Sequence, residues 1–416
     1  MSETILVIGL TVFFAHFLSL QFRKTNIPDV LMLMLLGIVL GPVFGVVTPE
    51  DFGKIGSLIA TIALVVILFE SGTSLDLDTL SKLLATTGFL TFWCFVLTTV
   101  IVTLIGVYVL DLHVMPATML GVILGGTSPA VVIPLVHALK LSQQPATVLV
   151  LESALADVLS IVGVFALLQV HVQGGLEPGK IIGGVLAALI FAAIIGVLGG
   201  IGWMLVLGKI RDFPDTISST LAFLFILYGV AEMLGFSGAI AALTLGITLT
   251  NYEKLGLRAI KQLDRKIEPL SDTDLSFYRE SVFLLKTYFF VYLGISIRFG
   301  HVSIAITAAL MVVLVFMMRL ALSRMVFRDA GYSRRDTAFA SMMGPKGLAS
   351  AVLAALPLQF HVEGGEVIRD TTYMVVLISI TLSAVLVMSY QAPLVQRIYG
   401  FVLGKPHEQK SVKTEQ

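Results

Sequence analysis

The sequence predicts an all-α protein that crosses a membrane many times. Of its 416 residues, 57% are hydrophobic and 13% are charged, and the mean hydropathy is +0.96. Soluble domains carry roughly 25% charged residues, so this composition indicates a polytopic membrane protein. The chain holds thirteen apolar segments near the spanning length of a helix, which is roughly 20 residues. Two of these segments are interrupted at their centres, a pattern typical of secondary transporters.

The thirteen predicted helices are joined by mostly short connections. The longest polar connection, 251–279, contains EKLGLRAIKQLDRKIEPL and predicts an amphipathic surface helix between two halves of the chain. We expect one membrane transport domain over 1–401 and a disordered cytoplasmic tail over 402–416. The predicted helices lie near 4–21, 28–47, 54–71, 83–110, 115–138, 146–170, 181–207, 216–234, 236–250, 280–297, 303–325, 336–357 and 371–396.

Lysine and arginine in the connections predict the orientation of the chain. With the amino terminus outside, the cytoplasmic connections and the tail hold eighteen of these residues, against four on the opposite side. Cytoplasmic loops carry the excess of positive residues in membrane proteins. We therefore expect the amino terminus outside, the carboxyl terminus in the cytoplasm and an odd number of helices.

Several functional classes are excluded or disfavoured by the residues present. The net charge of zero, with no basic patch, argues against a nucleic-acid partner. Cys94 is the single cysteine, so the chain forms no intrachain disulfide and no cysteine-based zinc site. The start MSETILVIGL has no basic region, and it predicts a first membrane helix rather than a cleaved signal peptide. No Ser/His pair, metal-binding histidine pair or paired-aspartate motif indicates an enzyme, and no cofactor is expected.

The interrupted segments are the fifth and the twelfth. The fifth carries GGTSPAVVIP, with Gly126, Ser128 and Pro129 at its centre, and the twelfth carries GPKG, with Gly344, Pro345 and Lys346. Proline removes a backbone donor and glycine loosens a helix, so both helices are expected to break there. If helices 1–6 and 8–13 form inverted repeats, the two breaks occupy matching positions and mark a midplane site. Two ordinary proline kinks are the alternative.

The sixth segment, with LVLESALADVLSIV, carries two acidic residues where a charge is costly. Ser153, Asp157 and Ser160 are spaced to share one helix face, which forms a stripe of oxygen groups suited to a hard cation. Glu152 lies on another face and needs its own partner. Arg319, deep in the eleventh segment, is the natural candidate for a buried pair with a structural role.

Three further charged residues lie at helix ends or breaks and need an interpretation. Glu70, in LFESGTSLDLDTL, lies at a helix end, where an acid at the membrane surface is the simpler interpretation. Lys286 is expected to extend its ammonium group from its helix to the cytoplasmic surface. Lys346 is harder to assign to the surface, because it lies at the centre of the second break.

These motifs together resemble a known family. LFESGTSLDLDTL, GGTSPAVVIP, LESALADVLSIV, FFVYLGISI, MMRLALS and GPKGLASAVLAAL, in this order, are similar to monovalent cation/proton antiporters, most closely the NhaP-like sodium/proton exchangers. The resemblance implies an NhaA-like fold of two inverted six-helix repeats with crossed discontinuous helices. It also implies a homodimer in a prokaryotic inner membrane, in which helices 4–6 and 11–13 move as a core against helices 1–3 and 7–10.

The resemblance also assigns roles to residues. It implies that Asp157 is the essential carboxylate for cation or proton, and that Ser153 and Thr127 supply further oxygens. Glu70 matches an acid that joins this site in NhaP-like members. Glu152 and Arg319 match a buried ion pair, and Lys346 stands where the family usually has arginine.

One residue departs from the family pattern. Ala156 stands where the family has Asn or a second Asp before the essential aspartate. One carboxylate suggests one proton for each cation, and hence electroneutral exchange. The expected function is exchange of Na⁺ for H⁺, with Li⁺ or K⁺ as other candidate ions. The alternatives are a K⁺/H⁺ antiporter and a cation-coupled symporter of an organic anion; a channel should show a continuous polar lining instead.

Overall fold

The structure is a computed structural model built from helices. It describes residues 9–17, 28–75, 77–173, 178–210, 218–255, 270–300, 302–329 and 332–403. Within these ranges no strand occurs, and the all-α prediction is confirmed for the part of the chain that is described.

The helices of the amino-terminal half follow the predicted segments. The first described helix covers residues 9–17, inside the predicted segment 4–21. The others are α2 (Asp29–Ile38), the π-helical turn η1 (Val39–Val43), α3 (Pro49–Thr73), α4 (Leu77–Tyr108), α5 (Val114–Ile123), α6 (Pro129–Ala138) and α7 (Gln143–Gln173).

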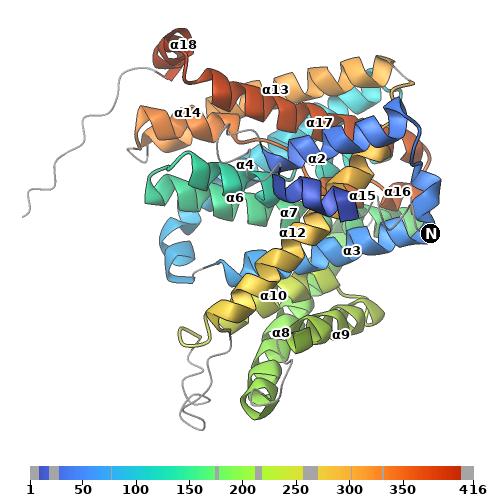
Figure 1. Ribbon diagram of the computed structural model, residues 1–416, viewed down its shortest axis with the longest axis vertical. Helices are drawn as coiled ribbons and strands as arrows, with labels where there is room; N and C mark the ends of the chain where they lie inside the picture. The colour runs from blue at the N-terminus through green and yellow to red at the C-terminus, as the bar shows by residue number, and fades with distance from the viewer. Residues whose placement is uncertain are drawn as a thin grey trace, which may run out of the picture.

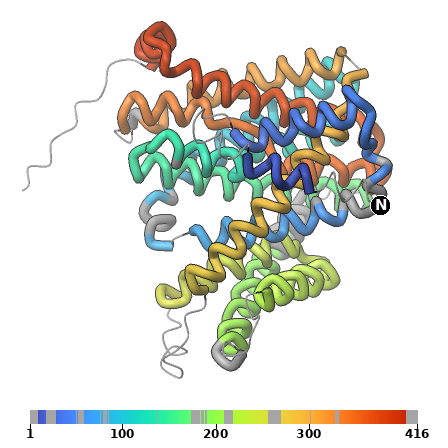
Figure 2. Tube along the Cα trace, viewed as in Figure 1, coloured from blue at the N-terminus to red at the C-terminus, as the bar shows by residue number. Residues whose placement is uncertain are grey.

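The rest of the chain is also helical, and some of its helices are short. In Figure 1, α13, α14 and α17 lie in the upper part of the view, α8 and α9 in the lower part, and α12 runs obliquely between them; Figure 2 shows the same path as a tube. The helices are α8 (Pro178–Ile210), α9 (Ser219–Met233), α10 (Gly238–Thr250), α12 (Asp272–Ile295), α13 (Val302–Asp329), α14 (Arg334–Met342), α15 (Leu348–Leu353), α16 (Leu356–Gln359), α17 (Gly365–Ser389) and α18 (Pro393–Leu403).

The predicted surface connection 251–279 is too long. The helix that follows it, α12, begins at Asp272. Ser271 and Asp274 form a capping box there: Ser271 N donates to Asp274 Oδ2 at 2.8 Å, and Asp274 N donates to Ser271 Oγ at 3.2 Å. These bonds satisfy backbone donors that a helix start leaves free, so the helix extends into polar sequence. The amphipathic helix expected in this connection falls largely on residues 256–269, which lie outside the described residues.

The last predicted helix, 371–396, is two helices. Membrane helix α17 starts six residues earlier, ends at Ser389, and is followed by the separate helix α18 from Pro393. Proline cannot donate within a continuing helix but is suited to a first helical turn, which explains the new start. The tail predicted from 402 begins too early, because α18 includes Leu403; residues 404–416 lie outside the described residues.

Both predicted interruptions fall on non-helical residues. The fifth predicted segment is divided into α5 and α6 by residues 124–128, and the twelfth is divided into α14 and α15 by residues 343–347. Every residue of both breaks is buried. Pro129 occupies the first position of α6, where the missing donor has no cost.

Two pairs of helices cross at glycines. In the crossing of α2 with α12, a Cβ at Gly37 would collide with Val291 O, and one at Gly294 with Met34 O. The crossing of α3 with α10 is similar: a Cβ at Gly72 would collide with Leu243 O, and one at Gly246 with Phe69 O. Small residues allow such close backbone approach between membrane helices.

Five of the described helices are long and apolar enough to cross a membrane. They lie within α4, α7, α8, α13 and α17, and shorter apolar helices accompany them. The prediction of thirteen spans is not tested by this count, because the broken segments are divided into shorter helices. The five spans are Ala85–Tyr108, Gln143–Val172, Ile190–Leu207, Val302–Phe327 and Gly365–Ser389.

Candidate ion-binding site

The two breaks are in contact with one another. Ser128 N, in the first break, donates to Pro345 O in the second at 2.8 Å. Lys346 Nζ donates to Gly126 O at 2.9 Å, and Ser350 Oγ donates to Ile123 O at 2.8 Å. Each bond satisfies a group that the interrupted helix leaves without a partner. The two broken segments therefore supply hydrogen-bond partners for each other's backbone groups in the protein interior.

A glycine in the second break allows this approach. A Cβ built at Gly347 would collide with the Oγ and Cβ atoms of Ser128. Any side chain at that position would push the breaks apart. The position lies just after Lys346, in the GPKG sequence that predicted the interruption.

Asp157 lies on α7 and faces the first break. Its side chain is buried, with 6% of the residue exposed. A Cβ built at Gly126 would lie 2.8 Å from Asp157 Oδ1 and 3.0 Å from Ser160 Oγ, so both oxygens point at the bare backbone of that glycine. Among the described residues, no hydrogen bond or salt bridge holds the Asp157 carboxylate. A buried charge without a partner is costly, and a cation or a proton would relieve that cost.

Two serine hydroxyls at the junction also lack partners, that of Ser160 beside the Asp157 carboxylate and that of Ser128 beside Gly347. Ser128 Oγ and Ser160 Oγ are buried and make no hydrogen bond with any residue that the structure describes. Hydroxyl oxygens can accept a cation as well as a hydrogen bond. The sequence placed Ser160 on the polar stripe of Asp157, whereas Ser128 was identified only as part of a helix break.

Lys346 supplies a positive charge at the same junction. Its backbone N donates to Ser379 Oγ at 3.0 Å, and its ammonium group reaches Gly126 O in the opposite break. Among the described residues, this ammonium group forms no salt bridge with Asp157, although both lie at Gly126. A second serine of α17, Ser383, donates to Met342 O at 2.9 Å and satisfies the end of α14. These two serines were missed, although their spacing of four residues in an apolar helix is a usable signal.

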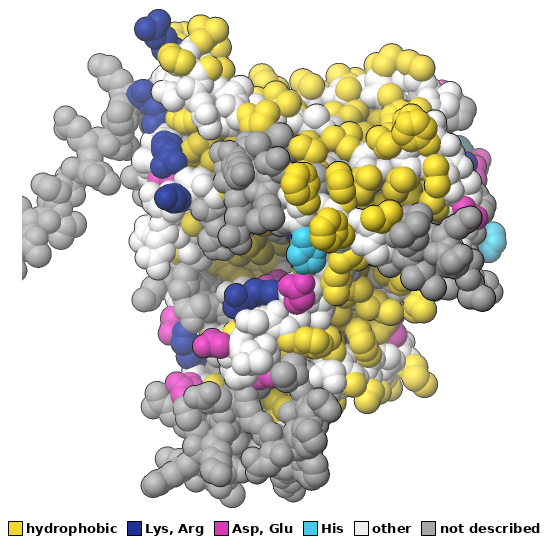
Figure 3. Space-filling model, in the orientation of Figure 1, with side chains coloured by type: hydrophobic (Ala, Val, Ile, Leu, Met, Phe, Trp, Pro, Cys, Tyr) yellow, Lys and Arg dark blue, Asp and Glu magenta, His cyan; other side chains and the backbone are white. Residues whose placement is uncertain are grey.

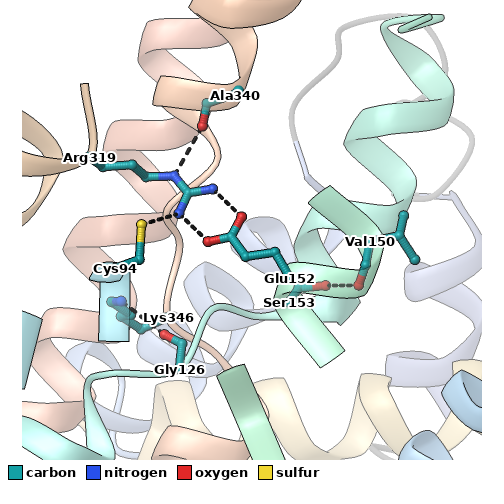
Figure 4. Close-up of polar contacts among 8 residues, drawn as sticks. All are labelled: Cys94, Gly126, Val150, Glu152, Ser153, Arg319, Ala340 and Lys346. Atoms are coloured by element: carbon teal, nitrogen blue, oxygen red, sulfur yellow. Dashed lines mark hydrogen bonds and ion pairs between the residues drawn. The ribbon is translucent and has the colours of Figure 1, made fainter. Parts of the chain in front are cut away.

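The structure brings Glu152 and Arg319 together (Figure 4). Arg319 Nη1 and Nη2 donate to Glu152 Oε1 and Oε2 at 2.6 and 2.7 Å, a bidentate pair. Arg319 Nε donates to Ala340 O at 3.0 Å, and Nη1 contacts Cys94 Sγ at 3.7 Å. Both charged residues are buried. The pair therefore links α4, α7, α13 and α14 around the second break.

The remaining predicted ligands lie at different distances from the junction. Ser153 is buried one turn before Asp157, but its Oγ donates to Val150 O of its own helix at 2.8 Å. Thr127 is buried in the first break, between the two residues whose backbone meets the second break. Glu70, at the end of α3, is half-buried, and in the described part of the chain it forms no hydrogen bond or ion pair with Asp157. Glu70 as a ligand of the ion therefore stays a prediction.

Glu70 instead lines a large cavity. The cavity has a volume of about 590 Å³ and lies between the end of α3, α6 and the start of α7. Lys140 and Thr147 line it toward the surface, and Val150 and Leu151 line it immediately before the acidic stretch of α7. It therefore approaches the segment that carries the candidate site from one end of the molecule.

Lys286 does not extend to the surface as expected. Its Nζ lies 2.7 Å from Asp29 Oδ2, and both side chains are largely buried between α2 and α12. The expectation was wrong because the partner was overlooked: Asp29 follows Pro28 at the start of an apolar run. The Asp29 carboxylate thus provides Lys286 with a partner of opposite charge in the interior.

Comparisons with known proteins agree with this architecture. The sequence model of the sodium/hydrogen exchanger family, transmembrane, matches residues 9–388. The Na⁺/H⁺ antiporter NhaS2 of Synechocystis is 26% identical over 73% of this chain and 53% of its own length. The K⁺/H⁺ antiporter NhaP2 of Shewanella oneidensis is 23% identical over 87% of this chain and 62% of its own length. The chain thus spans between half and two thirds of these two relatives.

A solved structure shows the same fold. The sodium proton antiporter MjNhaP1 of Methanocaldococcus jannaschii matches with a TM-score of 0.75 and 22% identity, over 96% of this chain and 99% of its own. Curated Na⁺/H⁺ antiporter 1 of the same organism is 25% identical over 83% of this chain and 81% of its own length. Because the family model covers most of the sequence, the chain belongs to the transmembrane sodium/hydrogen exchanger family.

Proposed function

We propose that the chain exchanges a monovalent cation for a proton across a membrane, with Asp157 as the shared binding group. One observation carries this proposal: the buried Asp157 carboxylate has no partner among the described residues and faces the junction of two broken helices, beside the equally unpartnered hydroxyl of Ser160. Either ion neutralises the carboxylate, and the two therefore compete for it. With neither bound, the charge stays uncompensated, and carrying it through an apolar barrier is disfavoured. This penalty couples the two ion movements.

The ligands of the cation in this proposal are oxygens at the junction. Asp157 supplies the charge, Thr127 and Ser153 supply oxygens from the break and from α7, and the hydroxyls of Ser128 and Ser160 complete the set. Glu70 acts at a distance, as an acid in the wall of the cavity through which ions reach the site from the cytoplasm. Oxygen ligands suit hard cations such as Na⁺, Li⁺ and K⁺.

Na⁺ is the cation we propose first, and K⁺ is the second candidate. Relatives named for each ion match this chain at similar identity, 26% for one Na⁺/H⁺ antiporter and 23% for one K⁺/H⁺ antiporter. Ala156, directly before Asp157, is apolar and buried, so no second carboxylate adjoins the first on α7. We therefore propose one proton for each cation and electroneutral exchange.

The moving part in this proposal is the core formed by helices 4–6 and 11–13, which are α4 to α7 and α13 to α17. The other predicted helices form the scaffold and the contact of a homodimer. Two inverted repeats are supported by the glycine crossings, since exchanging the halves converts the α2–α12 crossing into the α10–α3 crossing. We place the protein in a prokaryotic inner membrane, with the amino terminus outside and the carboxyl terminus in the cytoplasm.

The test is ion exchange in proteoliposomes with an imposed pH gradient. Internal pH is followed while Na⁺, Li⁺ or K⁺ is added, for the native protein and for Asp157→Asn. We expect at least one of the three cations to evoke proton movement, and we expect this movement to be lost in the variant. The cation that evokes it is the transported ion. Full exchange by Asp157→Asn, or no exchange with any of the three cations, would overturn the proposal and favour the organic-anion symporter.

A further inference from the structure

The short helix α18 follows directly after a membrane-spanning helix. Its predecessor α17 is one of the five helices long and apolar enough to cross a membrane. Only residues 390–392 separate Ser389 from Pro393, where α18 begins. A connection of three residues spans at most about 10 Å, so α18 starts at the bilayer surface. Figure 1 shows it beyond the end of α17, turned away from the direction of that helix.

One face of α18 packs on the protein. Leu403 is buried, and Val395 and Tyr399 are half-buried. The Tyr399 ring lies 5.9 Å from that of Tyr390, at an angle of 73°. These three positions are spaced by four residues, so they form one stripe along the helix.

A second apolar face of α18 has no partner in the chain as described. Leu394 is 69% exposed, Ile398 is 53% exposed and Phe401 is 90% exposed. Their spacing of four and then three residues places them side by side on the helix. The third face is polar, and it carries the exposed residues Gln396 and Arg397. An apolar stripe between a protein-facing side and a polar side is the pattern of a helix that lies in a membrane surface.

Positive residues gather at the same end of the molecule. In Figure 3, Lys and Arg side chains lie along the edge that carries α18, whereas hydrophobic side chains cover much of the face beside it. Arg324 at the end of α13 and Arg335 at the start of α14 are exposed, as is Arg397. Such residues next to a membrane helix attract anionic lipid headgroups. Lipid is therefore the occupant that fits both the apolar stripe and its charged border.

We propose that α18 is an interfacial helix that fastens this end of the protein to anionic lipid. Leu394, Ile398 and Phe401 enter the boundary between headgroups and acyl chains, and Arg397 contacts the headgroups.

The lipid attachment reaches the broken helix α14 through aromatic contacts. The Phe339 ring on α14 lies 4.8 Å from the Tyr390 ring, which in turn contacts Tyr399 on α18. Arg334, at the start of α14, lies over Gly400 of α18, since a Cβ there would be 3.4 Å from its Nη1 atom. Lipid that fixes the position of α18 therefore also constrains α14, the helix that ends at the second break. An effect of lipid on ion exchange through α14 rests on the proposed function, whereas the placement of α18 in the membrane surface does not.

The placement is tested by site-specific labelling in proteoliposomes of phosphatidylcholine with about a third phosphatidylglycerol, an anionic composition. The natural Cys94 is buried, so Phe401→Cys and Arg397→Cys each add one reactive thiol for a polarity-sensitive fluorophore. We expect the label at 401 to be shielded from aqueous iodide and the label at 397 to be quenched. Equal quenching at both positions would overturn the placement. Shielding that disappears on dilution with lipid would indicate a second copy of the chain and would also overturn it.

The coupling is tested by exchange rates in the same vesicles and in phosphatidylcholine alone. We expect faster exchange with anionic lipid for the native chain, and a roughly fivefold smaller effect for Arg397→Gln, since one basic residue at the surface contributes about that factor. Phe401→Ser should also weaken the dependence, whereas Phe299→Ser, the same change at an exposed residue between α12 and α13, should not. A native chain that is indifferent to anionic lipid, or an Arg397→Gln chain with native dependence, would overturn the coupling. Labelling still decides the placement if no exchange is detected.

Discussion

Two carboxylates on α7, five residues apart, have opposite surroundings. Glu152 is 1% exposed and Asp157 is 6% exposed, so burial does not distinguish them. Glu152 receives both terminal nitrogens of Arg319, whereas Asp157 receives no hydrogen bond from any described residue. A carboxylate that is fully paired within the protein has no capacity left for a transported ion. The unpaired one does, because neither Arg319 nor Lys346 bonds to it.

The helix itself separates the two roles. Five residues correspond to about 140° of rotation, which turns Glu152 and Asp157 toward different partners. Glu152 faces α13 and α14 through Arg319, and Asp157 faces the first break. The face of α7 that carries Glu152 therefore stabilises the fold around the breaks, and the face that carries Asp157 is available to bind an ion.

The largest expected effect comes from breaking the pair. Arg319→Met should lower the free energy of unfolding by about 3–5 kcal/mol, because Glu152 would remain buried and charged. The double variant Glu152→Gln/Arg319→Met should recover most of that loss, since no uncompensated charge remains. Denaturant unfolding in mixed micelles measures both.

Asp157→Asn is the matched control on the other side of α7. It should leave the free energy of unfolding unchanged or raise it, because it removes an unpaired charge. If Asp157→Asn destabilised the protein as much as Arg319→Met, the distinction between the paired and unpaired acids would be lost.

A methyl group at Gly126 should affect the surroundings of Asp157 and not the Glu152–Arg319 pair. The added Cβ would lie 2.8 Å from Asp157 Oδ1 and 3.0 Å from Ser160 Oγ. Overpacking of this kind costs about 1–3 kcal/mol, so we expect the KM for the cation to rise by roughly ten- to a hundredfold. Proteoliposome exchange measures the KM. Gly202→Ala on α8, where nothing lies within 4 Å, is the control. A native KM in Gly126→Ala would contradict the assignment of the site.

Removing one hydroxyl should have a smaller effect. Ser160→Ala should raise the KM for the cation about five- to tenfold, the loss of one polar interaction, and should alter the ratio of KM values among Na⁺, Li⁺ and K⁺. Ser323→Ala on α13 removes another buried hydroxyl without a hydrogen-bond partner and should leave those ratios as they are. A uniform change of all three KM values in Ser160→Ala would indicate a structural role instead.

The smallest expected effect concerns Asp51, whose carboxylate is exposed at the start of α3. Thr48 donates to Asp51 from its backbone N at 2.7 Å and from its hydroxyl at 2.9 Å, and these bonds lower the pKa of the exposed Asp51 carboxyl. The capping bonds therefore stabilise the start of α3 above the ordinary pKa of an aspartate, and this stabilisation is lost as the pH falls through the lowered value. Asp51→Asn should remove that pH dependence, as measured by amide hydrogen exchange in the first turn of α3. An unchanged pH profile would contradict this account.

The sequence predicted the local features of the site well. Glycine and proline mark both breaks, because they act on the backbone where they stand. The i, i+4 and i+7 spacing put Ser160 on the face of Asp157, since a helix has a fixed period. These signals lie within one segment and need no knowledge of packing.

Features that depend on two distant segments were harder to predict. The bond from Ser128 N to Pro345 O exists only because the breaks cross. Asp29 and Lys286 are far apart in sequence, and their ion pair depends on how α2 packs against α12. Helix α18 was merged with α17, because an apolar run continues across Ser389 and only Pro393 marks the boundary.

The cross-bonding of the breaks has a consequence for sidedness. Ser128 and Lys346 each bond to a backbone carbonyl of the opposite break, and Ser350 on α15 bonds to Ile123 O at the end of α5. Neither break can shift without rupturing these bonds, so the ligands travel together and keep their geometry. An ion arriving from either compartment then meets the same set of oxygens. Under the proposed function, the order of preference among alkali ions should be identical when measured from the two faces of the bilayer.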